Sequence, residues 1–123
     1  MRSFLFLLFC FFSFLGFHAQ TDNCSAAPTL IVNATCSSPA AGTSLGATQS
    51  IAGCTGNADD DVWYKFVASA TSHSFQIVGS AGFDAVVEFF SGTCSTLNSI
   101  ACVDATNNGC TESGLLSGLT IGN

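Results

Sequence analysis

The chain has 123 residues, the length of one domain, and a formal net charge of −6 at pH 7. Two residues are Lys or Arg and eight are Asp or Glu. This balance argues against nucleic acid as a partner, because nucleic acids are bound by Lys and Arg side chains that replace counterions. It also gives no electrostatic attraction to anionic membranes, and it is compatible with cation binding.

The first segment, residues 1–19, is predicted to be a secretory signal peptide. Arg2 and the amino terminus form its positive end, and an apolar run covers residues 4–17. That run is shorter than the roughly 20 residues that cross a hydrocarbon core, and it has the length of the apolar part of a signal peptide. Ala19 provides a small residue for cleavage. We therefore expect an exported protein, secreted or at the cell surface, with residues 20–123 as the mature module.

Short β-prone segments between turn residues make up the rest of the chain. This pattern, with turns such as "TGN", "SAGF" and "TNNG", is typical of an all-β, antiparallel β-sandwich. The strongest segment is "DVWYKFVA", in which alternation places Val62, Tyr64 and Phe66 on one face of a central strand. The predicted strands are 29–35, 61–68, 72–80, 85–92, 98–103 and 113–121.

Three consecutive aspartates, Asp59, Asp60 and Asp61, precede the strongest segment, and Asp84 and Asp104 lie at other turn-to-strand junctions. Such junctions gather at the ends of a sandwich, and Ca²⁺ takes six to eight oxygen ligands. We therefore treat these five aspartates as a hypothetical calcium site, although the spacing of an EF-hand is absent. The alternative is that they are solvated turn residues, with Asp61 bonding local backbone amides as Asp does in turns.

Six cysteines remain outside the predicted signal peptide, and an even number in an exported chain predicts disulfides. Cys94 and Cys102 are the favoured pair, because a short loop between neighbouring strands can bring Cα atoms to bridging distance. The pairing of the others is left open: Cys24, Cys36, Cys54 and Cys110. A zinc site is the weaker alternative, since C-x-x-C spacing is absent and His73 is the only histidine outside the signal.

The sequence assigns no catalytic residue. A hydrolytic triad needs a histidine base, and the serines on either side of His73 point away from its ring in a strand. Trp63 and Tyr64 are candidates for stacking on a ligand, with a place in the core as the alternative for Trp63.

Two motifs carry a resemblance to a known family. "ADDDVWYKF" combines an acidic turn with an aromatic strand, and "FDAVVEFFSG" is followed by Cys94, Cys102 and Asp104. This pattern resembles the bacterial pre-peptidase C-terminal (PPC) domain, and more closely the secreted modules of that type in Gram-negative bacteria with type IX secretion.

The resemblance implies a jelly-roll-like β-sandwich that is a non-catalytic accessory or adhesion module of a larger secreted protein. Its partners would be other domains of the same polypeptide and an extracellular polymer or surface protein, and some relatives bind calcium or collagen. The family's next strand does not follow "GLTIGN", so we expect a C-terminally incomplete module. The alternative is the N-terminal fragment of a secreted peptidase or other hydrolase whose catalytic domain lies beyond residue 123.

Overall fold

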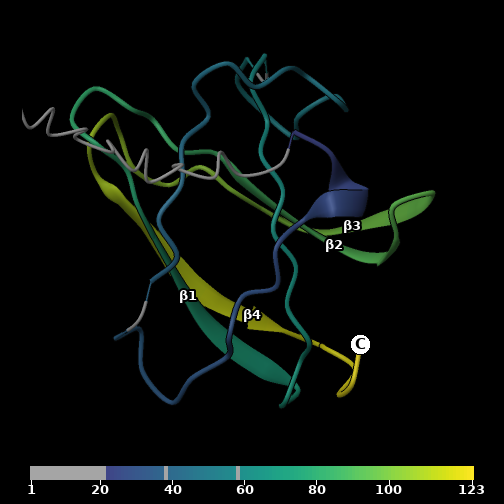
Figure 1. Ribbon diagram of the computed structural model, residues 1–123. Helices are drawn as coiled ribbons and strands as arrows, with labels where there is room; N and C mark the ends of the chain where they lie inside the picture. The colour runs from purple at the N-terminus through teal and green to yellow at the C-terminus, as the bar shows by residue number, and fades with distance from the viewer. Residues whose placement is uncertain (1–21, 38, 58) are drawn as a thin grey trace, which may run out of the picture.

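The computed structural model describes residues 22–37, 39–57 and 59–123 (Figure 1), so the predicted signal peptide lies outside the described residues. The elements are a short 3-10 helix, η1, and four strands, which confirms the all-β prediction. Their bounds are η1 Cys24–Ala26, β1 Ser72–Val78, β2 Val87–Thr93, β3 Thr96–Val103 and β4 Thr111–Ser117. None of the helical structure in the described ranges is long and apolar enough to cross a membrane.

The strands form two antiparallel pairs. β1 pairs with β4, and β2 pairs with β3 in a hairpin that lies between them in the sequence (Figure 1). The β2–β3 ladder has an irregularity between Phe89 and Phe90. The arrangement is antiparallel as expected, and the complete jelly-roll sandwich remains a prediction.

The segment 61–68, expected to be a central strand, is not one. Together with 29–35 it contributes one isolated parallel bridge, between Thr29 and Lys65. The backbone of Lys65 bonds residues 28 and 30, at 3.0 and 2.7 Å, whereas that of Ala68 bonds the C-terminal residues 122 and 123. The backbone hydrogen bonds of the segment 61–68 are thus divided between two distant parts of the chain. For this reason the segment forms no continuous ladder. The four other predicted segments overlap β1 to β4, with ends displaced by a few residues.

The apolar core of the described residues is thin. Its buried apolar side chains are Ala27, Ala68, Ala85 and Leu116. Several large apolar side chains stay exposed, with Leu45, Ile31 and Val78 the most exposed. A small domain with so little buried apolar surface depends on additional cross-links for its stability.

Two disulfides supply such cross-links. Cys24 is bonded to Cys94 with Cα atoms 5.7 Å apart, and Cys54 is bonded to Cys102 with Cα atoms 6.0 Å apart. Both join the N-terminal half of the described chain to the β2–β3 hairpin. Cys36 and Cys110 are free and exposed.

The predicted pairing of Cys94 with Cys102 is therefore wrong. Cys94 lies in the turn between β2 and β3, whereas Cys102 lies near the far end of β3. The strand from Thr96 to Cys102 alone separates the two by roughly 20 Å. The hairpin aligns β3 with β2, so it does not bring the two ends of β3 together.

Candidate functional site

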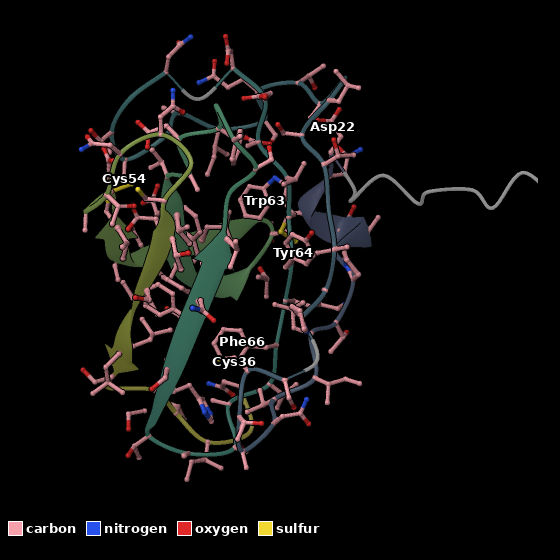
Figure 2. The ribbon with its side chains drawn as sticks, turned by 90° about the vertical axis from the view of Figure 1, so that its left-hand side faces the viewer. Asp22, Cys36, Cys54, Trp63, Tyr64 and Phe66 are labelled. Carbon is pink, nitrogen blue, oxygen red and sulfur yellow. A yellow bond between two sulfur atoms is a disulfide. The ribbon has the colours of Figure 1, made fainter. Side chains whose placement is uncertain are left out.

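A hollow of about 220 Å³ is the candidate binding site. Its walls come from Ser44 and from the segments 51–57, 60–63 and 83–90. Figure 2 shows Trp63 and Cys54, which both line it, in one half of the molecule, whereas Phe66 and Cys36 lie toward the other end. Four carboxylates line the hollow, Asp60, Asp61, Asp84 and Glu88, together with the apolar side chains of Ile51, Val62, Trp63, Phe83, Val86 and Phe90.

A disulfide fixes one wall. Cys54 is bonded to Cys102, which lies opposite Glu88 in the β2–β3 ladder. The loop 51–57 is thereby tied to β3, at the residue that pairs with the glutamate of β2. Gly56 in this loop lies close to the side chain of Val86, which a Cβ atom at position 56 would meet at 3.6 Å.

Asp61 fixes a second wall. Its carboxylate accepts hydrogen bonds from the backbone N–H of Ser50 (2.9 Å) and of Ile51 (3.2 Å), from the Ser50 hydroxyl (2.7 Å), and from the indole N–H of Trp63 (3.1 Å). The alternative expectation, that this aspartate bonds the local backbone amides of its own turn, is wrong about which amides it bonds. The amides belong to a segment ten and eleven residues earlier rather than to its own turn.

These contacts determine the protonation of Asp61. Partial desolvation raises its pKa, but the hydrogen bonds from Ser50, Ile51 and Trp63 together outweigh this effect, so the pKa lies below its ordinary value. Asp61 is therefore an anionic anchor that holds the walls in place.

Trp63 connects the anchor to β2. Its indole N–H also donates to the Ser50 hydroxyl at 2.9 Å, and its ring lies 5.7 Å from that of Phe90, tilted by 33°. Tyr64, the other aromatic candidate, does not line the hollow. Its half-buried position raises the pKa of its hydroxyl by desolvation.

The other three carboxylates of the hollow differ in whether they accept a hydrogen bond from the described residues. Asp60 accepts a hydrogen bond from the Ser44 hydroxyl at 2.8 Å, and Glu88 accepts one from the Ser99 hydroxyl. Asp84 has no hydrogen-bond or ion-pair partner within residues 22–37, 39–57 and 59–123. Its carboxylate is therefore available to a ligand.

The structure brings three of the five aspartates of the calcium hypothesis to one place. Asp60, Asp61 and Asp84 line the hollow, whereas Asp59 and Asp104 do not. Asp59 instead accepts a hydrogen bond from the neighbouring Asn57 side chain. Across the described residues, no group of three or more His, Cys, Asp or Glu side chains is placed to hold a metal ion. Calcium binding remains a hypothesis that would need backbone carbonyl or water ligands.

No basic side chain among the described residues balances the charge of the hollow. Lys65 is the only Lys or Arg among the described residues; it is exposed and lies outside the hollow. The site therefore presents negative charge beside apolar surface.

His73 has a structural role. Its Nε2 accepts hydrogen bonds from the backbone N–H groups of Ser69 and Ala70, at 3.1 and 3.2 Å. Its ring lies edge-on to Phe66, with centroids 6.1 Å apart. The nitrogen that a general base would use thus orders the turn that leads into β1.

Sequence reasoning missed one charged residue with an important place in the fold. Glu112 of β4 is 1 % exposed, and its carboxylate accepts hydrogen bonds from the backbone N–H groups of Ala105 and Thr106 and from the Thr106 hydroxyl. The hydroxyl contact is the main reason that the pKa of Glu112 lies below its ordinary value; desolvation opposes this shift, and the two amides add to it. The sequence signal is weak: a carboxylate near the start of a strand, with no basic residue near it.

Comparison with known proteins finds no matching protein family, no matching curated protein and no matching solved structure.

Proposed function

We propose that residues 20–123 form a non-catalytic accessory or adhesion module of a larger secreted protein, and that the module binds its ligand in the hollow beside Trp63. The observation that carries the proposal is the composition of that hollow, in which carboxylates and aromatic rings share one open surface. A disulfide and the hydrogen bonds of Asp61 hold its walls before any ligand arrives. Preorganisation of this kind reduces the ordering cost of binding.

Two further features support an extracellular accessory role. Disulfides persist in oxidising compartments, and the two in this chain agree with the predicted signal peptide. The thin core and the exposed apolar side chains suit a module that packs against other domains of its own polypeptide. The PPC-like motifs point to the same role.

The test is binding to immobilised matrix polymers, with collagen and a panel of polysaccharides as probes. The disulfide-intact chain is compared with its Asp84→Asn and Phe83→Ser variants, which change exposed side chains of the hollow. The matched control is Asp104→Asn, an exposed carboxylate outside it. We expect binding that the hollow variants weaken and the control leaves intact. Binding that is equal in all four proteins would place the ligand elsewhere.

Calcium is a second candidate ligand, because Asp60, Asp61 and Asp84 all line the hollow and backbone carbonyls or water could complete the ligand set. Calorimetric titration and a melting-temperature shift at millimolar Ca²⁺ test it. The absence of both signals would remove calcium from the proposal and leave polymer binding untouched.

A further inference from the structure

We propose that the hollow recognises a basic polypeptide segment, with a Lys or Arg side chain of the partner entering among its carboxylates. This inference rests on the proposed function, because it names the chemistry of the ligand for the same site. Four observations carry it: the mixed lining, the dispersed carboxylates, the unpartnered Asp84 and the charge of the chain.

The lining combines apolar surface with negative charge. Phe83 and Val86 are 41 % and 40 % exposed, and they line the hollow beside Asp84. Lys and Arg side chains have the complementary form, since an apolar stem carries a charged head. Aromatic rings near the head add a cation–π attraction.

The carboxylates are dispersed around the hollow. A bare metal ion needs several oxygens at about 2.0 to 2.6 Å from one point, and no three acidic, histidine or cysteine side chains of the described chain meet that need. A guanidinium or ammonium group forms longer contacts through several N–H donors. An extended basic segment can also bring a second charge to a second carboxylate.

The carboxylates of the hollow have two different roles: some hold its walls in place, and others are open to a ligand. Asp61 is already engaged by Ser50, Ile51 and Trp63, so it holds the walls. Asp84 has no partner in the part of the chain that the structure describes, and it is exposed. We therefore assign Asp84 as the principal contact for the incoming cation.

The charge of the chain selects the partner. The described residues carry eight carboxylates and one basic side chain, Lys65. A second copy of the chain would bring the same negative surface, and like charges oppose association. An anionic polymer is disfavoured for the same reason. A basic protein segment offers both a positive charge for the carboxylates and apolar side-chain stems for the apolar lining of the hollow.

The experiment titrates the isotope-labelled, disulfide-intact chain with a short peptide that alternates Lys and Ala, and follows backbone amide shifts by NMR. A peptide with Glu in place of Lys is the negative probe. We expect shifts in 51–57, 60–63 and 83–90, and an affinity that falls when salt is added. Asp84→Asn is expected to weaken binding by about tenfold and Asp84→Lys to abolish it, because one charge-assisted contact is lost or reversed.

Asp104→Asn is the control, and it should bind as the unmodified chain does. Equal weakening by Asp84→Asn and Asp104→Asn, or shifts spread over every acidic segment, would show general attraction to negative surface and overturn the inference. So would the absence of peptide binding. If polymer binding in the previous test depends on the hollow while the basic peptide fails to bind, the proposed function stands and this inference alone fails.

Discussion

Phe75 of β1 and Phe89 of β2 lie with their ring centroids 4.7 Å apart, tilted by 56°. Of the ring contacts in the described ranges, this one connects the two strand pairs directly. Phe75 also lies over Gly114 of β4, its partner in the ladder, where an added Cβ would stand 3.0 Å from the ring. The absence of a side chain at Gly114 leaves room for the ring that joins the pairs.

Replacing either phenylalanine by Ala should therefore loosen the contact between the strand pairs. We expect Phe75→Ala and Phe89→Ala each to lower the free energy of unfolding by about 2 kcal/mol, less than for fully buried rings because both are half-buried. The double variant should show a coupling of about 1 kcal/mol in a denaturant-based cycle. Phe83→Ala, an exposed ring, is the control, and strict additivity would contradict the direct contact.

Glu112→Gln should destabilise the connection between β3 and β4. The amide group of Gln would place donors where Glu112 accepts from Ala105 and Thr106. We expect the variant to have a lower melting temperature than the unmodified chain. We also expect its hydrogen exchange to be accelerated more at those two amides than at the amides of the β2–β3 ladder. Asp104→Asn, next to the same connection but exposed, should change neither. Unchanged protection at both amides in Glu112→Gln would contradict the assigned role.

The same carboxylate predicts acid sensitivity. Because the pKa of Glu112 is lowered in the folded protein, its contribution to stability is fully present above the ordinary pKa of a glutamate and is lost as the pH falls through the lowered value. The unmodified chain should therefore lose stability with acid more steeply than Glu112→Gln does. Parallel stability-versus-pH curves would refute this linkage.

Asp61 can be followed through the only tryptophan of the chain. Trp63 donates its indole N–H to Asp61, so protonation of the carboxylate removes an acceptor next to the fluorophore. The lowered pKa of Asp61 places this change below the ordinary range of an aspartate, with the stabilisation present above that range and lost as the pH falls.

We expect a fluorescence transition in that acidic window which disappears in Asp61→Asn. We also expect this variant to lose about 1 kcal/mol of stability at neutral pH, since a partly exposed anionic acceptor is replaced. Asp59→Asn should keep the transition, because Asp59 bonds only the Asn57 side chain among the described contacts. A transition that persists in Asp61→Asn would assign the fluorescence change to another group.

Peptide mapping under non-reducing conditions should recover Cys24 linked to Cys94 and Cys54 linked to Cys102, with free thiols at Cys36 and Cys110. Finding Cys94 linked to Cys102 would contradict the structure. Replacing both members of either bond by Ser should lower stability by about 2 to 5 kcal/mol.

The sequence predicts the strands whose alternation is regular. In β1, Phe75 and Ile77 are half-buried and the residues on either side of each are exposed, as the alternation of these two apolar residues in the segment indicates. The segment 61–68 misleads because apolar residues occupy both faces, and alternation does not specify which partners take the backbone hydrogen bonds. Those partners lie at the two ends of the described chain.

The site was predictable in part. The aspartate run identified Asp60 and Asp61 as residues of interest, but the role of Asp61 depends on Ser50, eleven residues earlier, which no local pattern marks. Disulfide pairing was out of reach, because the fold rather than spacing brings Cys24 to Cys94.

The positions of the two disulfides determine how the described chain would respond to tension. A force between Asp22 and Asn123 would pass through the bond from Cys24 to Cys94, so the backbone of β1 and β2, which lie between these cysteines, would not be stretched. Extension would proceed by peeling β4 from β1 and β3 from β2, and it would end at a short covalent limit. Reduction of the Cys24–Cys94 bond would remove that limit, so the reach of the module under load would depend on the redox state of its surroundings.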